Sequence, residues 1–218
     1  MRSHIQFYPS NWEWRGTLQA NKRPVEGVGI NDVDYATTIQ INGGRLYCPA
    51  YQSWKSMLRR CYNTGYHRTR PSYVGVTCQK PWLRFSNFRC WYFEHLETVR
   101  SLGYEGPLEL DKDILSDSKT YGPKNCVLIP PALNNLLNDQ ANRRGGYSIG
   151  ITKFQGKFRA NVRVNGKQKG KAGFTTPEEA AKWRLQTKLK QVMNYSIPPW
   201  LDESIVRPRL IEIVKNQR

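Results

Sequence analysis

The sequence lacks any apolar run of about 18 residues, the length that a membrane-spanning helix needs. Its first ten residues contain no apolar core of a secretory signal. Acidic residues are few, because 17 Asp and Glu stand against 34 Lys and Arg, for a net charge of +17. This excess favours a polyanionic partner, since each phosphate that Lys or Arg neutralises releases condensed counterions. We expect a soluble, cytoplasmic protein that binds nucleic acid, with no membrane partner and no small-molecule substrate.

Cysteine is also scarce, with five residues in the chain and no CxxC pair. In a reducing compartment such thiols are expected in a core or on a metal, and not in a disulfide framework. Four of them would form a structural Zn²⁺ site if they met in space, with Cys90 left over as a packing residue. These four are Cys48, Cys61, Cys78 and Cys126.

The length of 218 residues suits one large domain or two small ones. Hydrophobic residues make up 39% and aromatic residues 12%, which is enough for real cores. We expect residues 1–47 to form an irregular arm followed by a β segment at 36–41. A central domain over 48–140, a basic module over 141–195 and a tail over 196–218 follow. The tail is expected to be helical from Leu201 and interrupted at Pro208.

Positive charge is concentrated in residues 141–192, where thirteen Lys and Arg stand against Glu178 and Glu179. A solvated surface could carry the same excess of positive charge, but here the charge coincides with a sequence pattern that predicts strands and a helix. The thirteen are Arg143, Arg144, Lys153, Lys157, Arg159, Arg163, Lys167, Lys169, Lys171, Lys182, Arg184, Lys188 and Lys190.

Two turn sequences, Gln155-Gly156 and Asn165-Gly166, enclose a segment whose polarity alternates with a period of two. Such alternation predicts a strand with one apolar face and one cationic, amide-bearing face. The apolar set is Phe158, Ala160, Val162 and Val164, and the polar set is Arg159, Asn161, Arg163 and Asn165.

A helix is predicted directly after these strands. Thr176 would be its N-cap, Pro177 its first residue and Glu179 the partner in a capping box. Ala181, Leu185, Leu189 and Val192 then recur at helical spacing, and this stripe would cover the apolar face of the sheet. We therefore expect a three-stranded antiparallel sheet packed on one helix. Its uncovered face suits the DNA major groove, where Arg can reach guanine and Asn adenine.

The basic module resembles the apetala-two (ethylene-response-factor) DNA-binding domain, which also occurs at the C-terminus of bacteriophage endonucleases. The residues that carry the resemblance are Tyr147, Gly150-Ile151, Gly156-Lys157-Phe158, Ala160, Val162-Arg163, Gly173-Phe174, Thr176 and Glu178-Glu179-Ala180-Ala181. It implies that Arg159, Asn161 and Arg163 read bases, with Lys153 and Lys157 near phosphates. Arg143, Arg144, Lys167 and Lys169 complete the expected DNA-binding set. Base specificity does not carry over, because Ser148, Thr152 and Gln155 stand where plant members have Arg and Trp contacts.

Residues 50–137, the central part of the chain, are rich in aromatic residues and are expected to be almost neutral in charge. Tyr51, Trp54, Leu58 and Cys61 share one face of a predicted helix. Residues 65–71 are expected to be a loop, and an amphipathic run begins at Trp82. We interpret the Trp and Phe residues of this part as core.

Residues 108–135 contain a pattern that could carry chemistry. The run Leu110-Asp111-Lys112-Asp113-Ile114 ends an apolar strand, and Val127-Leu128-Ile129 forms a second one. Pro130-Pro131 then opens a helix with Asn134 and Asn135. Oxygen atoms of Asp and Asn suit one Mg²⁺ or Mn²⁺, which would stabilise the leaving oxygen of a phosphodiester.

The whole central pattern resembles phage HNH-type endonucleases of the ββα-metal class, many of them homing enzymes. The matching residues within about 25–137 are Gly27-Val28-Gly29, Asn31-Asp32, Trp54, Met57, Arg60-Cys61-Tyr62-Asn63, Tyr73, Gly75-Val76, Cys78, Trp82, Phe85, Phe88, Leu110 to Ile114, Tyr121, Pro123, Asn125-Cys126 and Asn134. The resemblance implies that Asp111 and Asn134 hold the metal. Asn125 would brace the loop through hydrogen bonds.

The histidine that serves as general base in that family is replaced here by Lys112. Lys112 itself, Asp113, His67 or His95 could activate water, and Arg59 and Arg60 could neutralise developing charge. The expected fold class is α+β, with an HNH-like ββα-metal domain, flanking helices and the small sheet module. We expect a metal-dependent endonuclease that cuts or nicks double-stranded DNA in an infected bacterial host. A silent HNH scaffold acting as a DNA-binding regulator, and an RNA-binding protein, are the alternatives.

Overall fold

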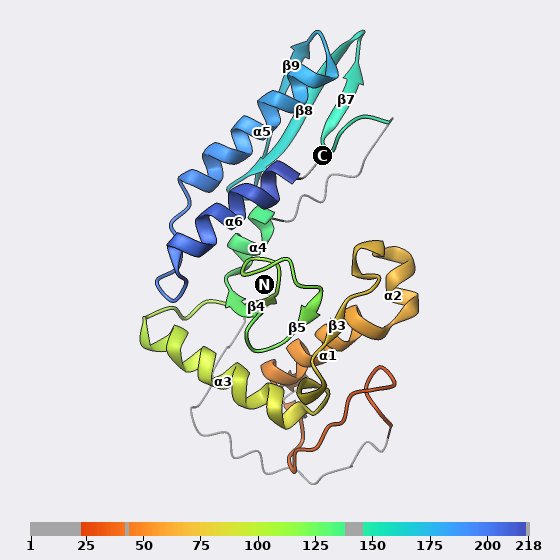
Figure 1. Cartoon of the computed structure of the whole chain (residues 1–218), viewed down its shortest axis with the longest axis vertical. Coiled ribbons are helices and arrows are strands. Elements are labelled where there is room, and N and C mark those ends of the chain that lie inside the picture. The colour runs from red at the N-terminus through yellow and green to blue at the C-terminus, as the bar shows by residue number, and fades with distance from the viewer. Residues whose placement is uncertain (1–22, 42–43, 138–145, 217–218) are drawn as a thin grey trace. The chain divides into compact units, whose positions relative to one another are not determined.

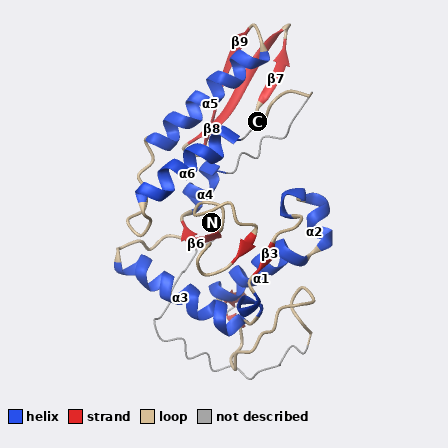
Figure 2. Cartoon of the chain, viewed as in Figure 1, coloured by secondary structure: helices blue, strands red, loops and turns tan. Residues whose placement is uncertain are grey.

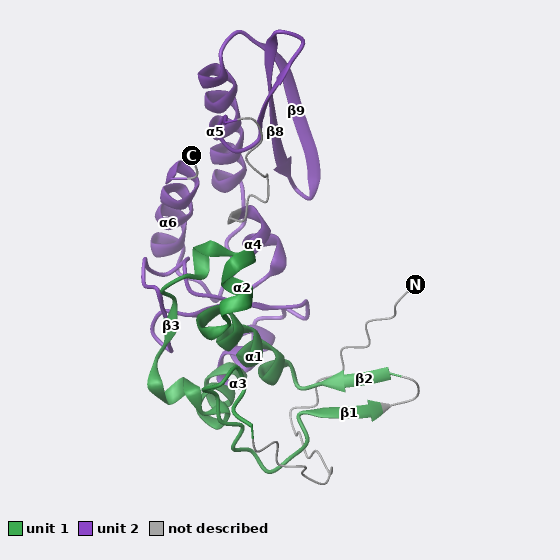
Figure 3. Cartoon of the chain, turned by 90° about the vertical axis from the view of Figure 1, so that its right-hand side faces the viewer, with its two compact units in different colours: residues 1–93 green, residues 94–218 purple. Residues whose placement is uncertain are grey.

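The computed structural model of the chain describes residues 23–41, 44–137 and 146–216 (Figure 1). Over these residues the fold is α+β, with six α-helices and several small sheets. The chain divides into two compact units, residues 1–93 and 94–218 (Figure 3). The domain limits expected at residues 47, 140 and 195 stay predictions.

Unit 1 contains a β-hairpin, β1 and β2, and then a series of helices. The β segment expected at 36–41 is confirmed as β1, and β2, which was not expected, pairs with it antiparallel. The elements of this unit are β1 (Thr38–Ile41), β2 (Gly44–Tyr47), α1 (Pro49–Tyr62), α2 (Thr64–Thr69), the 3-10 turns Pro71–Tyr73 and Lys80–Leu83, β3 (Thr77–Cys78) and the first half of α3 (Phe85–Ser101).

The predicted amphipathic helix is confirmed as α1, which buries Trp54, Leu58 and Cys61. The indole Nε1 of Trp54 donates a 2.7 Å hydrogen bond to the carbonyl of Trp82, so the buried ring keeps no unsatisfied donor. Gly29 packs against this helix so closely that a Cβ atom there would overlap Leu58 and lie 2.9 Å from the Trp54 ring. A glycine is therefore required at this position by packing.

The loop expected at residues 65–71 is wrong, because Thr64–Thr69 forms the helix α2. The Asn63 side chain caps this helix by accepting a 2.7 Å hydrogen bond from the backbone N–H of Tyr66. The next amphipathic run begins three residues later than predicted, at Phe85 in α3. Asp32 fixes this start by accepting hydrogen bonds from the Ser86 backbone N–H (2.9 Å) and hydroxyl (2.8 Å).

Unit 2 begins with the second half of α3 and continues with a strand, loop, strand and helix, followed by the sheet module and two further helices. Strands β4 and β6 pair antiparallel, with Leu110 opposite Leu128, as the apolar runs predicted. The elements are β4 (Glu109–Asp111), β5 (Thr120–Tyr121), β6 (Val127–Ile129), α4 (Pro131–Leu137), β7 (Ile151–Phe154), β8 (Lys157–Val164), β9 (Lys167–Phe174), α5 (Pro177–Met193) and α6 (Glu203–Asn216).

The three-stranded antiparallel sheet on one helix is confirmed, in the order β7-β8-β9 with α5 beside it (Figure 2). Both predicted turns have two successive residues at positive φ, 48° and 76° at Gln155-Gly156 and 49° and 76° at Asn165-Gly166. This geometry matches the twist of the flanking strands, so the turns fix the register. The capping box of Thr176 and Glu179 is also present.

The predicted apolar stripe of α5 does not cover the sheet as a whole. Ala180, Ala181 and Trp183 pack on the sheet, but Leu185, Leu189 and Val192 join a second cluster with β6, α4 and α6. Because α6 packs on α5, the helix has two covered sides. Two of the expected surface bases are buried as a result: Arg184 is 5% exposed and Lys188 is 1% exposed.

The interruption expected at Pro208 is wrong, because α6 continues through this residue to Asn216. Val206, Leu210 and Val214 are buried on one side of α6, while Pro208 is exposed. Burial of this apolar face therefore outweighs the hydrogen bond that proline cannot donate. In the part of the chain that the structure describes, no helix has the length and apolar character needed to cross a bilayer.

Candidate nucleic-acid interface and candidate metal site

The pairing of β8 with β9 decides which side chains share the uncovered face of the sheet. Arg159 lies opposite Ala172, Asn161 opposite Gly170 and Arg163 opposite Gln168. Directly opposite residues of an antiparallel pair point to the same side, and Ala160 and Val162 point to the other side, where they are buried. Arg159, Asn161 and Arg163 therefore share the face that α5 leaves open, which we call the open face.

Small residues on β9 make room for the long side chains of β8. A Cβ atom at Gly170 would lie 3.0 Å from both Arg159 Nη2 and Asn161 Oδ1. The guanidinium of Arg159 and the amide of Asn161 thus converge over Gly170. Together they present N–H donors, which suit base-edge acceptors and phosphate oxygens, and one amide oxygen, which can accept from the amino group of a base.

The third strand adds an aromatic residue that the sequence interpretation missed. Thr152 pairs with Arg159 and Phe154 pairs with Lys157, so both belong to the open face. Phe154 is 59% exposed, which is unusual for so large an apolar side chain. Its position two residues after Thr152 was the available signal, because a period of two places both on one face.

Three of the expected DNA-binding lysines lie on the opposite side of the sheet. Lys153 pairs with Phe158, Lys167 with Val164 and Lys169 with Val162, the residues that face α5. All three side chains are exposed. The structure therefore brings Lys157, Arg159, Asn161 and Arg163 together and separates these lysines from them. Arg143 and Arg144 lie outside the described residues.

Asp111, the expected metal ligand, ends β4 and holds the turn that follows. Its Oδ1 accepts hydrogen bonds from the backbone N–H of Asp113 (2.9 Å) and of Ile114 (2.8 Å). Burial raises the pKa of Asp111, and the neighbouring negative charge of Asp113 raises it further. A buried carboxylate in this situation is stabilised by any cation that it binds.

Asn134 on α4 reaches β4 through a residue that the sequence interpretation did not include. Its side-chain amide donates a hydrogen bond to the carboxylate of Glu109. Glu109 and Asp111 are two residues apart on β4 and so point to the same side of the strand. The structure thus gathers two carboxylates and an amide around β4 and α4. Oxygen donors of this kind fit a hard divalent cation such as Mg²⁺ or Mn²⁺.

No group of three or more His, Cys, Asp or Glu side chains within the described residues is arranged to hold a metal ion. The four cysteines considered for zinc therefore form no such group. Cys48, Cys61, Cys78 and Cys126 are all buried, and none of the four is in a disulfide. The candidate for a divalent cation is the smaller set of Asp111 and Asn134, with Glu109 beside them.

Lys112 points into the protein and is only 6% exposed. Its ammonium donates to the carboxylate of Asp113 and lies 5.8 Å from the centroid of the Tyr121 ring. Two of the four candidates for the general base, Lys112 and Asp113, are therefore engaged with one another. The backbone carbonyl of Asp113 also accepts a 3.0 Å hydrogen bond from Arg209 on α6, whose guanidinium pairs with Asp117 and Glu212. Arg209, in the segment expected to be the C-terminal tail (196–218), thus holds the loop after β4.

The remaining candidates for the catalytic site, Asn125, His67 and His95, lie in three different segments. Asn125 donates 3.1 Å hydrogen bonds to the Ser118 hydroxyl and to the Thr120 carbonyl, both in the loop between β4 and β6. His67 belongs to unit 1, where its Nε2 is 2.7 Å from the carbonyl oxygen of Arg60 and must donate to it. His95 lies on α3 and lines a cavity of about 280 Å³ with Glu94 and Trp200.

Comparison of the chain with known protein families, curated proteins and solved structures found no match.

Proposed function

We propose that the protein binds duplex DNA through the open face of β7-β8-β9. The observation that carries this proposal is the sharing of one exposed face by Lys157, Arg159, Asn161 and Arg163. Arginine and asparagine are the side chains that bind guanine and adenine edges with two hydrogen bonds in the major groove. A two- or three-stranded ribbon is narrow enough to enter this groove. Phe154 would add apolar contact, for which a thymine methyl group is the matching surface.

We further propose that the bound DNA is hydrolysed at the β4-β6-α4 element with one Mg²⁺ or Mn²⁺. Asp111 and Asn134 would hold the ion, in agreement with their oxygen donors and with the raised pKa of Asp111. The ion would neutralise charge on the scissile phosphate and polarise a bound water molecule. Asn125 would keep the loop in shape, and Lys112 would hold Asp113 in place beside the site.

The test of DNA binding compares two double variants that remove the same charge from opposite faces of the sheet. Arg159→Ala with Arg163→Ala changes the open face, and Lys167→Ala with Lys169→Ala changes the face toward α5. We expect the first pair to lose about tenfold or more in affinity for a selected duplex, because each bidentate base contact discriminates by about 1–3 kcal/mol. The second pair should lose less and keep its sequence preference. Equal losses, measured by fluorescence anisotropy, would mean that the open face has no special role.

The test of cleavage uses Asp111→Asn, which keeps an oxygen that can accept the two backbone N–H groups and removes the charge. We expect the wild type to nick or cut supercoiled plasmid with Mg²⁺ or Mn²⁺ and not with EDTA. The variant should retain its folding and its DNA affinity and lose at least about 100-fold in cleavage rate, the range seen when a group that stabilises transition-state charge is removed. Cleavage by the variant at the wild-type rate would contradict the assignment of Asp111.

A DNA-binding protein on a catalytically silent scaffold is the second candidate. The observation in its favour is the ion pair between Lys112 and Asp113, which engages both nearby candidates for a general base. Salt-sensitive binding of duplex DNA by the wild type, with no cutting under any divalent ion, would establish this second function.

A further inference from the structure

Unit 1 carries positive charge of its own, separate from the open face, which belongs to unit 2. Residues 35–93 contain nine Lys and Arg and no Asp or Glu. The almost neutral texture expected for the central part is therefore wrong for this stretch, which is as one-sided in charge as the sheet module. The nine bases are Arg45, Lys55, Arg59, Arg60, Arg68, Arg70, Lys80, Arg84 and Arg89.

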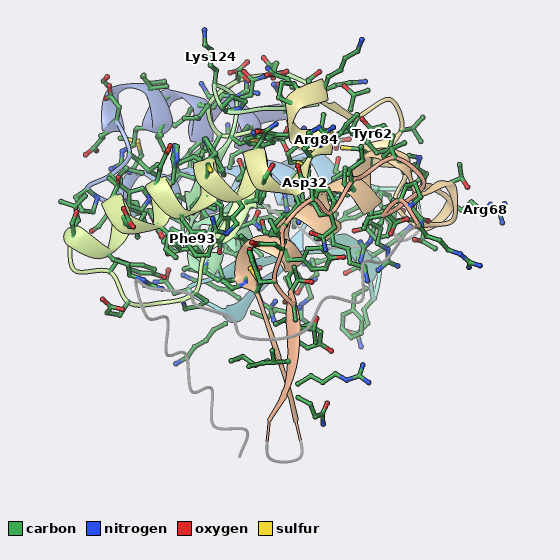
Figure 4. The ribbon with its side chains drawn as sticks, turned by 90° about the horizontal axis from the view of Figure 1, so that it is seen from below. Asp32, Tyr62, Arg68, Arg84, Phe93 and Lys124 are labelled. Atoms are coloured by element: carbon green, nitrogen blue, oxygen red, sulfur yellow. The ribbon has the colours of Figure 1, made fainter. Side chains whose placement is uncertain are left out.

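Four of these bases gather where α1 meets α2. Arg59 and Arg60 lie in the last turn of α1, and Arg68 and Arg70 lie in α2 and directly after it. We call this group the α1–α2 corner. Arg59, Arg68 and Arg70 are exposed, and Figure 4 shows Arg68 pointing away from the ribbon.

The corner is held in shape by contacts on both sides of the helix junction. Asn63 ends α1 and caps α2, and its Nδ2 donates a 2.7 Å hydrogen bond to Glu26. His67 binds the carbonyl of Arg60 at 2.7 Å and so ties α2 to the end of α1. The guanidinium of Arg59 lies 4.8 Å from the centroid of the Tyr66 ring. This order lowers the entropy that the arginines lose when they bind a partner.

Within residues 23–41, 44–137 and 146–216, the exposed arginines of the corner have no acidic partner. Arg59, Arg68 and Arg70 form no ion pair with any residue that the structure describes, whereas Arg84 of the same unit pairs with Asp32 at 3.3 Å. Glu26 is the acid beside this junction, and it is engaged with Asn63. Guanidinium groups in such a setting match phosphate in charge and in hydrogen-bond geometry.

We propose that the α1–α2 corner binds the phosphate backbone of duplex DNA as a second contact surface, in a different unit from the open face. This inference rests on the proposed function, which supplies the partner. The corner would contribute affinity without sequence preference, because phosphate contacts carry no direct base information.

The experiment compares two double variants of the full chain that each remove two exposed bases of unit 1. Arg68→Gln with Arg70→Gln changes the corner, and Arg45→Gln with Lys80→Gln is the control outside it. We measure affinity for a fixed duplex over a range of salt concentrations. The corner variant should lose about tenfold in affinity at low salt. The magnitude of its slope of log affinity against log salt should also fall by about 1 to 2, because each phosphate contact contributes about 0.9 to this slope. The control should change by less than half as much.

Equal changes in the two variants would overturn the inference, because the charge would then act only through the net field.

Failure of the inference is distinguishable from failure of the proposed function. If Arg159→Ala with Arg163→Ala weakens binding and the corner variant behaves as wild type, the corner alone is wrong. If the corner variant weakens binding and the open-face variant does not, the corner stands and the open face is wrong. A loss seen with structured RNA and absent with duplex DNA would overturn the choice of partner. Unchanged thermal unfolding of each variant excludes misfolding as the cause.

Discussion

At the scale of single residues, the buried cations of α5 are the clearest departure from the sequence pattern. Arg184 and Lys188 belong to the thirteen bases expected on a basic surface, and both lie inside unit 2. The ammonium of Lys188 donates a 2.7 Å hydrogen bond to the carbonyl of Leu136 on α4. Burial, together with a smaller contribution from the positive charge of Arg184, lowers the pKa of Lys188 to about 8.

This shift predicts a specific dependence of stability on pH. In the unfolded chain Lys188 keeps its proton up to a pKa of about 10.4, whereas the folded protein releases it from about 8. The unfolded state therefore binds more protons between these values, and the free energy of unfolding should rise with pH in this window by up to about 1.4 kcal/mol per pH unit. Denaturant titrations of wild type and Lys188→Met at pH 7, 8, 9 and 10 give the difference due to Lys188. A difference that stays constant over this range would contradict the assignment.

Gly150 shows how one residue connects the sheet to α5. Its φ is +77°, and a Cβ atom there would lie 2.6 Å from the carbonyl oxygen of Asn161 and 2.7 Å from Arg184 Nε. Both the left-handed backbone and the close approach require glycine. The burial of Arg184 and the shape of the turn before β7 therefore depend on this position.

At the scale of elements, α2 is a short helix whose existence depends on its cap. Six residues are too few to form a stable isolated helix, so tertiary contacts and the Asn63 cap must supply the missing free energy. The contact between His67 and the end of α1 is part of this supply.

We expect Asn63→Ala to lower the free energy of unfolding by about 1–2 kcal/mol, because the Tyr66 N–H loses its acceptor and Glu26 its donor. Asn63→Ser keeps an oxygen that can cap the helix and lacks the amide that binds Glu26. Serine should therefore restore the larger part of the loss, as measured by urea titration. Equal destabilisation by both substitutions would show that the contact with Glu26, and not the cap, matters.

At the scale of the whole molecule, positive and negative charge are distributed unevenly along the chain. Residues 35–93 and the sheet module are both strongly basic, whereas the acids of unit 2 include Glu109, Asp111 and Asp113 around β4. A protein with this division can hold a polyanion through its basic surfaces and keep carboxylates for a cation. The proposed binding and the proposed cleavage would then be separable, so Asp111→Asn and the arginine variants should have different effects.

Much of the sheet module could be predicted because its signals are local. The two turn dipeptides, the alternation of β8 and the capping box each act over a few neighbouring residues. The strands β4 and β6 and the start of α4 could be predicted for the same reason. The helix α2 was missed because Gly65 reads as a loop signal, although at the first turn of a helix it breaks no hydrogen bond.

The sequence by itself determined the local elements, the net charge and the residue types available for chemistry, because propensity, capping and turn geometry depend on near neighbours. Only the contacts between strands and helices place Lys167 and Lys169 on the side of the sheet toward α5 and bring Glu109 to Asn134. The tertiary structure also decided that Lys188 is buried and that α6 passes through Pro208. These outcomes depend on strand register and on which helix covers which side, and both are set by contacts between residues distant in the chain.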